Sequence, residues 1–319
     1  MVQLAKVDVV GVGLNATDTT IQIAEFPAYG SKVEYDAERV SLGGQVASTV
    51  VACQNWGLST RYVGKLGDDE AAALHAREFL RTGVEDHLIH VVGAASARSL
   101  ILVDKYGERT VLCRRDERLI LRPEELRREW IVNARALHVD GHDTEAAITA
   151  ARWAREAGVP VVADLDELYP GVETLIKKVD YLIVSRDFPC RLTGERRLES
   201  ALREMRVRFG CTLTAATLGP EGVLAWDGEQ LLHAAAYRVG VVDTTGAGDI
   251  FHAGFIYGLL QGWTLERQLD FSCAAAALNC RSEGARGGIG TVAAIEALMA
   301  VTPRYDGVED FSTLDRVIA

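Results

Sequence analysis

The second half of the chain alternates helix-like and strand-like segments, and this rhythm restricts the fold more than any other feature. Thr144 to Ala157 has a helical pattern that ends at Gly158. Apolar runs typical of buried strands occur between such helices, at residues 134–139, 159–163, 179–184 and 213–218. Strands that alternate with helices favour a parallel sheet. The sequence therefore predicts an α/β fold with a doubly wound, mostly parallel central sheet flanked by helices.

The stretch from Val241 to Gly254 (VVDTTGAGDIFHAG) joins the end of a strand to the start of a helical pattern. The small residues Gly246 to Gly248 let successive backbone N–H groups converge on an anion. The helix adds its unpaired N–H groups and the positive end of its dipole. Asp249 then lies where negative charge arrives, which suits a general base. Gly-x-Gly-Asp alone would more often be a turn and a helix cap, but Asp243, the two threonines and the small-residue helix that follows favour an anion site.

Composition argues against several other classes of protein. The 319 residues are 48% hydrophobic and 25% charged, as in a globular chain with a large core. No uncharged apolar run of about 18 residues occurs, so we expect no transmembrane helix and no membrane partner. The N-terminal residues lack the order of a signal peptide. The net charge of −11 argues against nucleic acid as a partner, and the six cysteines suit buried thiols in a reducing cytoplasm.

The segment Asp243 to Phe255 (DTTGAGDIFHAGF) resembles the second signature of the ribokinase-like (PfkB) family of sugar and nucleoside kinases. In that family the segment forms an anion hole, and its aspartate deprotonates the substrate hydroxyl that attacks the γ-phosphate of ATP. The resemblance implies that Asp249 is the base. It also implies that Gly246, Ala247 and Gly248 form the anion hole. The segment is not a Walker A loop, because no G-x-x-x-x-G-K-[ST] string occurs in the chain.

The same resemblance assigns residues to the sugar. Asp18 is similar to a family aspartate that binds substrate hydroxyls, and a carboxylate can accept two such hydrogen bonds. The pair Gly43-Gly44 resembles the signature Gly-Gly-x-x-x-Asn, with Ser48 in place of the asparagine. The segment His138 to Asp143 resembles one in ketohexokinases, so Asp140 is a candidate sugar contact. The implied substrate is a small sugar, with a ketohexose such as fructose as the first choice.

The resemblance also implies a site for ATP and Mg²⁺. The expected nucleotide contacts are Thr217, Gly219, Gly222 and Gly248. Many family members carry N-x-x-E, which helps to hold Mg²⁺ from its outer shell, where this chain has Ser185 to Phe188. How Mg²⁺ is held is therefore left open. Asp243 and the loop 280–289 are a candidate site for a monovalent cation such as K⁺.

We expect one kinase domain, residues 1–319, with a small β-sheet lid formed by approximately 15–40 and 97–116 inserted in it. The second part is predicted to be a hairpin that turns at Lys105 to Gly107. In the family, such a sheet covers the substrate. Because an exposed sheet has edges that need protection, we expect two copies to pair through their lids as a homodimer.

Three alternatives remain at this stage. The acceptor could be a nucleoside or a sugar phosphate, since Arg114 and Arg115 near the lid could bind an anionic group. The loss of N-x-x-E would also suit a catalytically weak nucleotide-binding regulator. A nicotinamide dehydrogenase would rest on Gly11-x-Gly13, although a strand-like pattern follows it. The histidines and aspartates of residues 138–143 also permit a metal site, but a third ligand is not evident.

Overall fold

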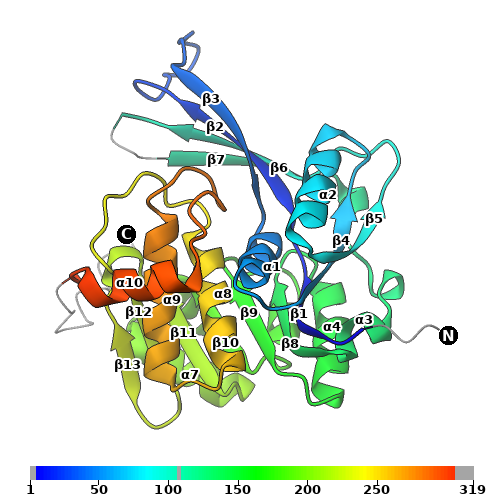
Figure 1. Cartoon of the computed structure of the whole chain (residues 1–319), viewed down its shortest axis with the longest axis vertical. Coiled ribbons are helices and arrows are strands. Elements are labelled where there is room, and N and C mark those ends of the chain that lie inside the picture. The colour runs from blue at the N-terminus through cyan, green and yellow to red at the C-terminus, as the bar shows by residue number, and fades with distance from the viewer. Residues whose placement is uncertain (1–4, 106–108, 306–319) are drawn as a thin grey trace.

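The structure is a computed structural model that describes residues 5–105 and 109–305 (Figure 1). Its main sheet contains β1 (Val7–Val12), β4 (Thr60–Leu66), β5 (Glu85–His90), β8 (Ala134–Asp140), β9 (Val161–Leu165), β10 (Tyr181–Ser185), β11 (Leu213–Thr217), β12 (Val223–Trp226) and β13 (Leu231–Ala234). The spatial order is β13-β12-β11-β10-β9-β8-β1-β4-β5. Neighbours from β11 to β5 are parallel, and the hairpin of β12 and β13 adds an antiparallel edge. The predicted doubly wound, mostly parallel sheet is confirmed.

Helices cover both faces of the main sheet. One face is covered by α1 (Gln45–Asn55), α8 (Ala247–Leu260) and α9 (Leu265–Asn279), and α10 (Val292–Val301) packs against α9. The other packs against α3 (Arg128–Val132), α4 (Thr144–Glu156), α5 (Val172–Ile176), α6 (Phe188–Thr193) and α7 (Leu198–Phe209). Helix α2 (Glu70–Thr82) packs beside α1 and β5, and short 3₁₀ turns lie at Glu117–Leu119, Pro123–Glu125 and Gly219–Glu221. Within the described residues, none of these helices has the length and apolar character needed to cross a bilayer.

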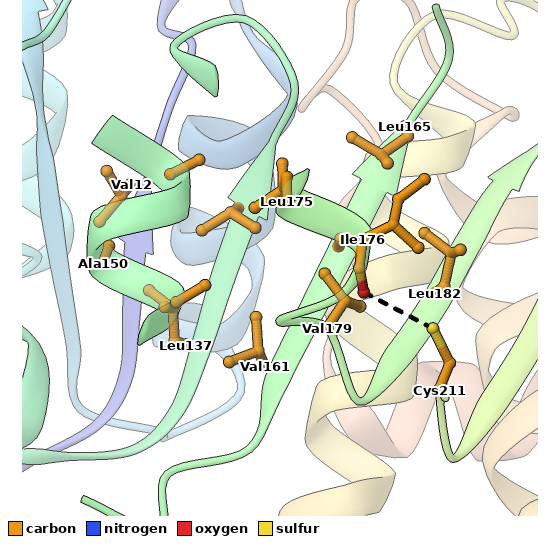
Figure 2. Close-up of a cluster of buried hydrophobic side chains, with 14 of the residues drawn as sticks. Val12, Leu137, Ala150, Val161, Leu165, Leu175, Ile176, Val179, Leu182 and Cys211 are labelled. Atoms are coloured by element: carbon orange, nitrogen blue, oxygen red, sulfur yellow. Dashed lines mark hydrogen bonds between the residues drawn. The ribbon is translucent and has the colours of Figure 1, made fainter. Parts of the chain in front are cut away.

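The larger part of the core lies between the main sheet and helices α3 to α7 (Figure 2). Leu182 of β10 and Leu175 of α5 are fully buried there. Each such leucine contributes roughly 1.5–3 kcal/mol by leaving water. On α4, Ala150 is also fully buried, and its small side chain lets the helix lie close to the strands. The thiol of Cys211 donates a weak hydrogen bond to the carbonyl of Ile176 at 3.8 Å, and burial raises its pKa to about 12.

A separate four-stranded sheet, here called the small sheet, stands beyond the carboxyl end of β1 (Figure 1). It contains β2 (Ala16–Gln22), β3 (Ala37–Gly43), β6 (Arg98–Val103) and β7 (Arg109–Arg114), in the order β3-β2-β6-β7. Strands β6 and β7 are antiparallel. The turn predicted at Lys105 to Gly107 lies largely outside the described residues. Since β2 and not a helix follows Gly11-x-Gly13, the chain has no dinucleotide-binding turn there.

Candidate active site

Polar side chains occupy the carboxyl ends of four neighbouring parallel strands. In β10, Ile183 packs on the α8 face of the main sheet, whereas Leu182 and Val184 pack on the opposite face. Because successive side chains alternate, Ser185 at the end of β10 also lies on the α8 face. The same alternation places Asp140 of β8, Asp164 of β9 and Thr217 of β11 on that face. The four side chains therefore border the region into which the N-terminus of α8 points.

The expected anion hole forms the start of α8. Gly246 precedes the helix with a φ of 74°, and a Cβ there would lie 2.3 Å from the carbonyl oxygen of Ala285. Only glycine fits that position. No side chain caps the helix, and a Cβ added to Gly248 would meet no atom within 4 Å. An uncapped helix N-terminus beside open space is an arrangement that stabilises a bound anion.

Asp249 lies in the first turn of α8 and is partly exposed. Burial in the site, followed by the charge of Asp164, raises its pKa to about 7. A hydrogen bond from the Ser48 hydroxyl and the nearby His252 and Arg286 act in the opposite direction. A carboxylate with a pKa near neutrality is suited to accept a proton during catalysis.

Asp164 is a site residue that the sequence interpretation missed. It is 7% exposed, and its Oδ2 lies 3.5 Å from Nδ1 of His252 on α8. Burial and the charges of Asp166 and Asp140 raise the pKa of Asp164 well above its usual range. The available signal was a carboxylate that interrupts the apolar run VVADL at the end of a strand.

Asn15 is a second residue that the sequence interpretation missed. It is buried between β1 and β2, and both its Nδ2 and Oδ1 lack a hydrogen-bond partner. The Oε1 of Gln45, at the start of α1, also lacks one. Because buried polar atoms are nearly always satisfied, these side chains are candidates for contact with a ligand.

The pair Gly43-Gly44 lets the chain between β1 and β2 approach α1. A Cβ on Gly43 would lie 2.1 Å from Oδ2 of Asp18. Gly44 has a φ of 94°, and a Cβ there would lie 2.6 Å from the Cα of Asn15. The two glycines therefore leave room for other parts of the protein's own chain. They bring Asp18, which is buried, to the helix that carries Ser48.

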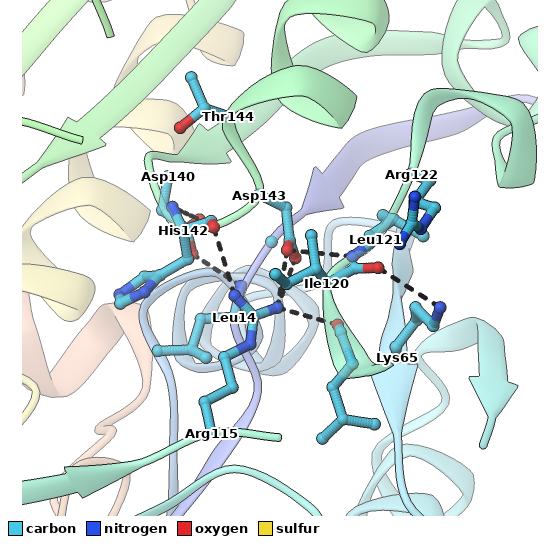
Figure 3. A network of polar contacts seen from close by, with 12 residues as sticks. Leu14, Lys65, Arg115, Ile120, Leu121, Arg122, Asp140, His142, Asp143 and Thr144 are labelled. Carbon is cyan, nitrogen blue, oxygen red and sulfur yellow. Dashed lines mark hydrogen bonds and ion pairs between the residues drawn. The ribbon is translucent and has the colours of Figure 1, made fainter. Parts of the chain in front are cut away.

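Asp140 holds the loops around the site (Figure 3). Its Oδ2 accepts the N–H of Leu14 at 2.7 Å, and its Oδ1 accepts the N–H of His142 at 3.0 Å. The side chain is fully buried, and these two bonds fix the chain on either side of it, while its contact with the sugar stays a prediction. Beside it, Arg115 donates to both oxygens of Asp143 at 2.7 and 2.8 Å. The guanidinium of Arg115 is thus engaged within the protein.

The four expected nucleotide contacts come together around one apolar cavity of about 210 Å³. Thr217, Gly219, Gly222 and Gly248 line it together with Phe251, Ala276 and Ala277. Both alanines belong to α9, and their small side chains form part of the cavity wall. A second cleft, of about 750 Å³, separates the small sheet from the loops before α8 and after α9. Thr244 lines both, so the two spaces meet beside the start of α8.

The carboxylate of Asp243 fastens two loops, because it accepts the N–H groups of Thr245 and Gly284, each at 2.8 Å. At the position of the missing glutamate, Phe188 is fully buried in the core. Nearby, the Ser185 hydroxyl can donate its one proton to the carbonyl of Asp166 or to Oδ1 of Asp187, each at 3.4 Å. Among the described residues, no group of three or more His, Cys, Asp or Glu side chains could hold a metal. The oxygen donors present suit an Mg²⁺ ion carried mainly by phosphates and water.

Known proteins share this architecture. Residues 6–291 match the pfkB family of carbohydrate kinases. The ATP-dependent ribose-1-phosphate kinase of Halopiger xanaduensis is 28% identical over 274 residues, which cover 84% of this chain and 90% of that protein. The aminoimidazole riboside kinase of Salmonella typhimurium is 30% identical over 234 residues, which cover 68% of this chain and 73% of that protein.

Among solved structures, the ribokinase of Arabidopsis thaliana complexed with ribose and ATP has a TM-score of 0.79 to this chain. It is 24% identical, and the match covers 93% of this chain and 99% of that one. The likeness shows that the fold is ribokinase-like. With the family match, it leads to one conclusion: the chain belongs to the pfkB family of carbohydrate kinases, phosphotransferases that act on hydroxyl acceptors.

Proposed function

We propose that this protein transfers the γ-phosphate of ATP to a hydroxyl group of a neutral sugar, with Asp249 as the general base. The observation that carries the proposal is the placement of Asp249. Its carboxylate, with a pKa raised to about 7, stands in the first turn of an uncapped helix. That helix begins where the apolar cavity and the cleft under the small sheet meet.

In this mechanism the base of ATP occupies the apolar cavity, and the γ-phosphate lies at the N-terminus of α8. The acceptor hydroxyl donates its hydrogen bond to Asp249, which takes the proton as the oxygen attacks phosphorus and ADP leaves. The N–H groups of residues 246–248 stabilise the charge that develops on the transferred group. Bound Mg²⁺ would neutralise phosphate charge, and Asp166 and Asp187 would orient its water ligands. The small sheet serves as a lid that limits access of water to the cleft.

The charges around the site favour a neutral acceptor. Asp18, Asp164 and Asp249 place carboxyl groups around it, which suits a ligand with hydroxyl groups, and the ionised form of Asp249 repels a second phosphate. In the cleft, Arg39 forms an ion pair with Glu283, and Arg115 is held by Asp143. A ketohexose such as fructose is our first candidate. The named relatives act on a sugar phosphate and on a riboside, so these two classes are the alternatives.

The test is release of ADP from Mg·ATP with a panel of ketohexoses, aldoses, sugar phosphates and nucleosides. We expect one neutral sugar to support turnover. Asp249→Asn should reduce that turnover by about 10²- to 10⁴-fold, because the base is lost. Preference for a phosphorylated acceptor would refute the neutral-sugar assignment. ATP binding without turnover by any acceptor would favour the regulator, and undiminished turnover in Asp249→Asn would exclude this aspartate as the base.

Two further assignments accompany this proposal. A monovalent cation such as K⁺ would bind beside Asp243, where the two fastened loops meet, and would raise the thermal stability in KCl above that in LiCl. We also place the reaction in the cytoplasm, because the six cysteines are all free thiols and four of them are buried.

A further inference from the structure

Arg286 crosses the site from the loop between α9 and α10, and its side chain is only 6% exposed. Its Nε donates to Oγ of Ser48 at 3.1 Å. One terminal nitrogen pairs with Glu78 on α2, and the other donates to the carbonyl oxygen of Gly43. The guanidinium therefore contacts two helices and Gly43, and the mechanism above gives it no role.

The direction of these hydrogen bonds determines what Ser48 can do. A guanidinium has donors and no acceptor, so the Ser48 hydroxyl must accept the bond from Arg286. The single proton of that hydroxyl is then available to the carboxylate of Asp249, to which Ser48 is hydrogen-bonded. An asparagine amide, which the resembled signature has at this position, carries its own donors. A serine hydroxyl can rotate and needs a partner to fix its direction.

We propose that Arg286 is a positioning residue that fixes the Ser48 hydroxyl as a hydrogen-bond donor to Asp249, and that Glu78 holds the guanidinium in place for this task. The inference rests on the proposed function, since it concerns the same base. It explains why serine at position 48 is compatible with an active site. Arg286 acts through Ser48 and does not touch the reacting atoms.

Four groups on different elements face Asp249. Asp164 approaches from the end of β9, His252 from α8, Ser48 from α1 and Arg286 from its loop. Behind Arg286, α2 presents Glu78 and the buried imidazole of His75. Loss of the guanidinium removes a positive charge and releases the Ser48 hydroxyl. Both changes make the Asp249 carboxylate less stable, so its proton should be retained to higher pH.

The experiment measures the titration of Asp249 in two ways. One is the acid limb of the pH profile of kcat/KM. The other is the ¹³C signal of the carboxyl carbon, assigned with Asp249→Asn, which needs no turnover. The variants are Arg286→Met, Arg286→Lys, Ser48→Ala and the double variant Ser48→Ala with Arg286→Met. Arg61→Met is the matched control, because Arg61 is fully buried and pairs with Glu85 at 2.8 Å. It lies at the start of β4, away from the carboxyl ends of the strands, where the site lies.

We expect Arg286→Met and Ser48→Ala each to raise the pKa of Asp249 by about one pH unit. The double variant should move it by less than the sum, since the two residues act in one chain of hydrogen bonds. Arg286→Lys should restore most of the wild-type value. Arg61→Met should lower thermal stability without moving the titration.

If Arg286→Met leaves the pKa of Asp249 unchanged, the inference is overturned. It is also overturned if the pKa shift in the double variant equals the sum of the shifts in the two single variants. If the wild type turns over and depends on Asp249, either result refutes only the role of Arg286. If no acceptor supports turnover, the proposed function fails, while the carboxyl signal still decides whether Arg286 and Ser48 control Asp249.

Discussion

At the scale of single residues, the raised pKa of Asp249 makes a stability prediction with a definite sign. The carboxyl has a pKa of about 7 in the native state against 3.8 in the reference state. Between these values the native state binds a proton that the unfolded chain lacks, so this group's contribution to stability falls as pH rises. An asparagine at position 249 cannot ionise, so the Asp249→Asn variant does not undergo this decrease in stability. The variant should gain thermal stability relative to wild type between pH 4 and 7, and the gain should stay constant above pH 7.

The measurement is thermal unfolding of both proteins across this pH range. Asp187→Asn is the matched control, because it makes the same substitution at a carboxylate that is about half exposed. A difference between Asp249→Asn and wild type that does not change from pH 4 to 8 would contradict the assignment.

The same pKa predicts the pH dependence of catalysis. Only the ionised carboxylate can accept the proton of the acceptor hydroxyl. We therefore expect kcat/KM to increase tenfold per pH unit below about pH 7 and to level off above it. Initial rates from pH 5 to 9 would check this. If the acid limb of the kcat/KM profile instead lies near pH 4, Asp249 titrates as an ordinary carboxylate in the free enzyme.

At the scale of elements, substitutions of the two glycines at the start of α8 are predicted to have different effects. Gly246→Ala places a Cβ in a left-handed backbone and 2.3 Å from the carbonyl of Ala285, so thermal stability should fall. Gly248→Ala has open space and a helical position, so stability should hold or rise by up to about 1 kcal/mol. Its methyl group, however, enters the space assigned to phosphate, so the KM for ATP should rise.

Paired unfolding and kinetic measurements on the two variants would check this contrast. Gly210→Ala, at the C-terminus of α7 in a left-handed backbone with open space around it, separates backbone strain from the steric clash. A Gly248→Ala variant that unfolds early but binds ATP normally would show that the open space has no role in binding.

The elements also show which parts of the site could be predicted from sequence. The strands, α8 and its glycine turn depend on local periodicity and backbone requirements, which adjacent residues reveal. Arg286 and Ser48 are 238 residues apart, and their contact depends on how the last loop packs over α1. Asn15 and Asp164 acquire their significance from burial, which only the packed structure supplies. The bonds from the backbone N–H groups of Leu14 and His142 to Asp140 likewise depend on how the loops pack, which local sequence does not reveal.

At the scale of the whole molecule, the two faces of the small sheet differ. Pairing in register places Val40, Thr19, Leu100 and Leu112 in one row across the sheet. Thr20 and Ile101, on the opposite face, line the cleft. Val40 is 53% exposed and Leu112 is 54% exposed, so the outer row presents apolar surface to water. Apolar surface on a sheet with open edges favours association with another chain.

We therefore predict a homodimer in which the outer faces of two small sheets pack together. Leu112→Lys would place a charge in that contact and should give a monomer in sedimentation velocity at micromolar concentration. Val111→Lys is the matched control: the residue is the neighbour of Leu112 in β7 and is 43% exposed, but it pairs with Ile101 on the cleft face. That variant should stay dimeric. A wild-type monomer at all concentrations would exclude the dimer, and dissociation by both variants would place the contact elsewhere on the small sheet.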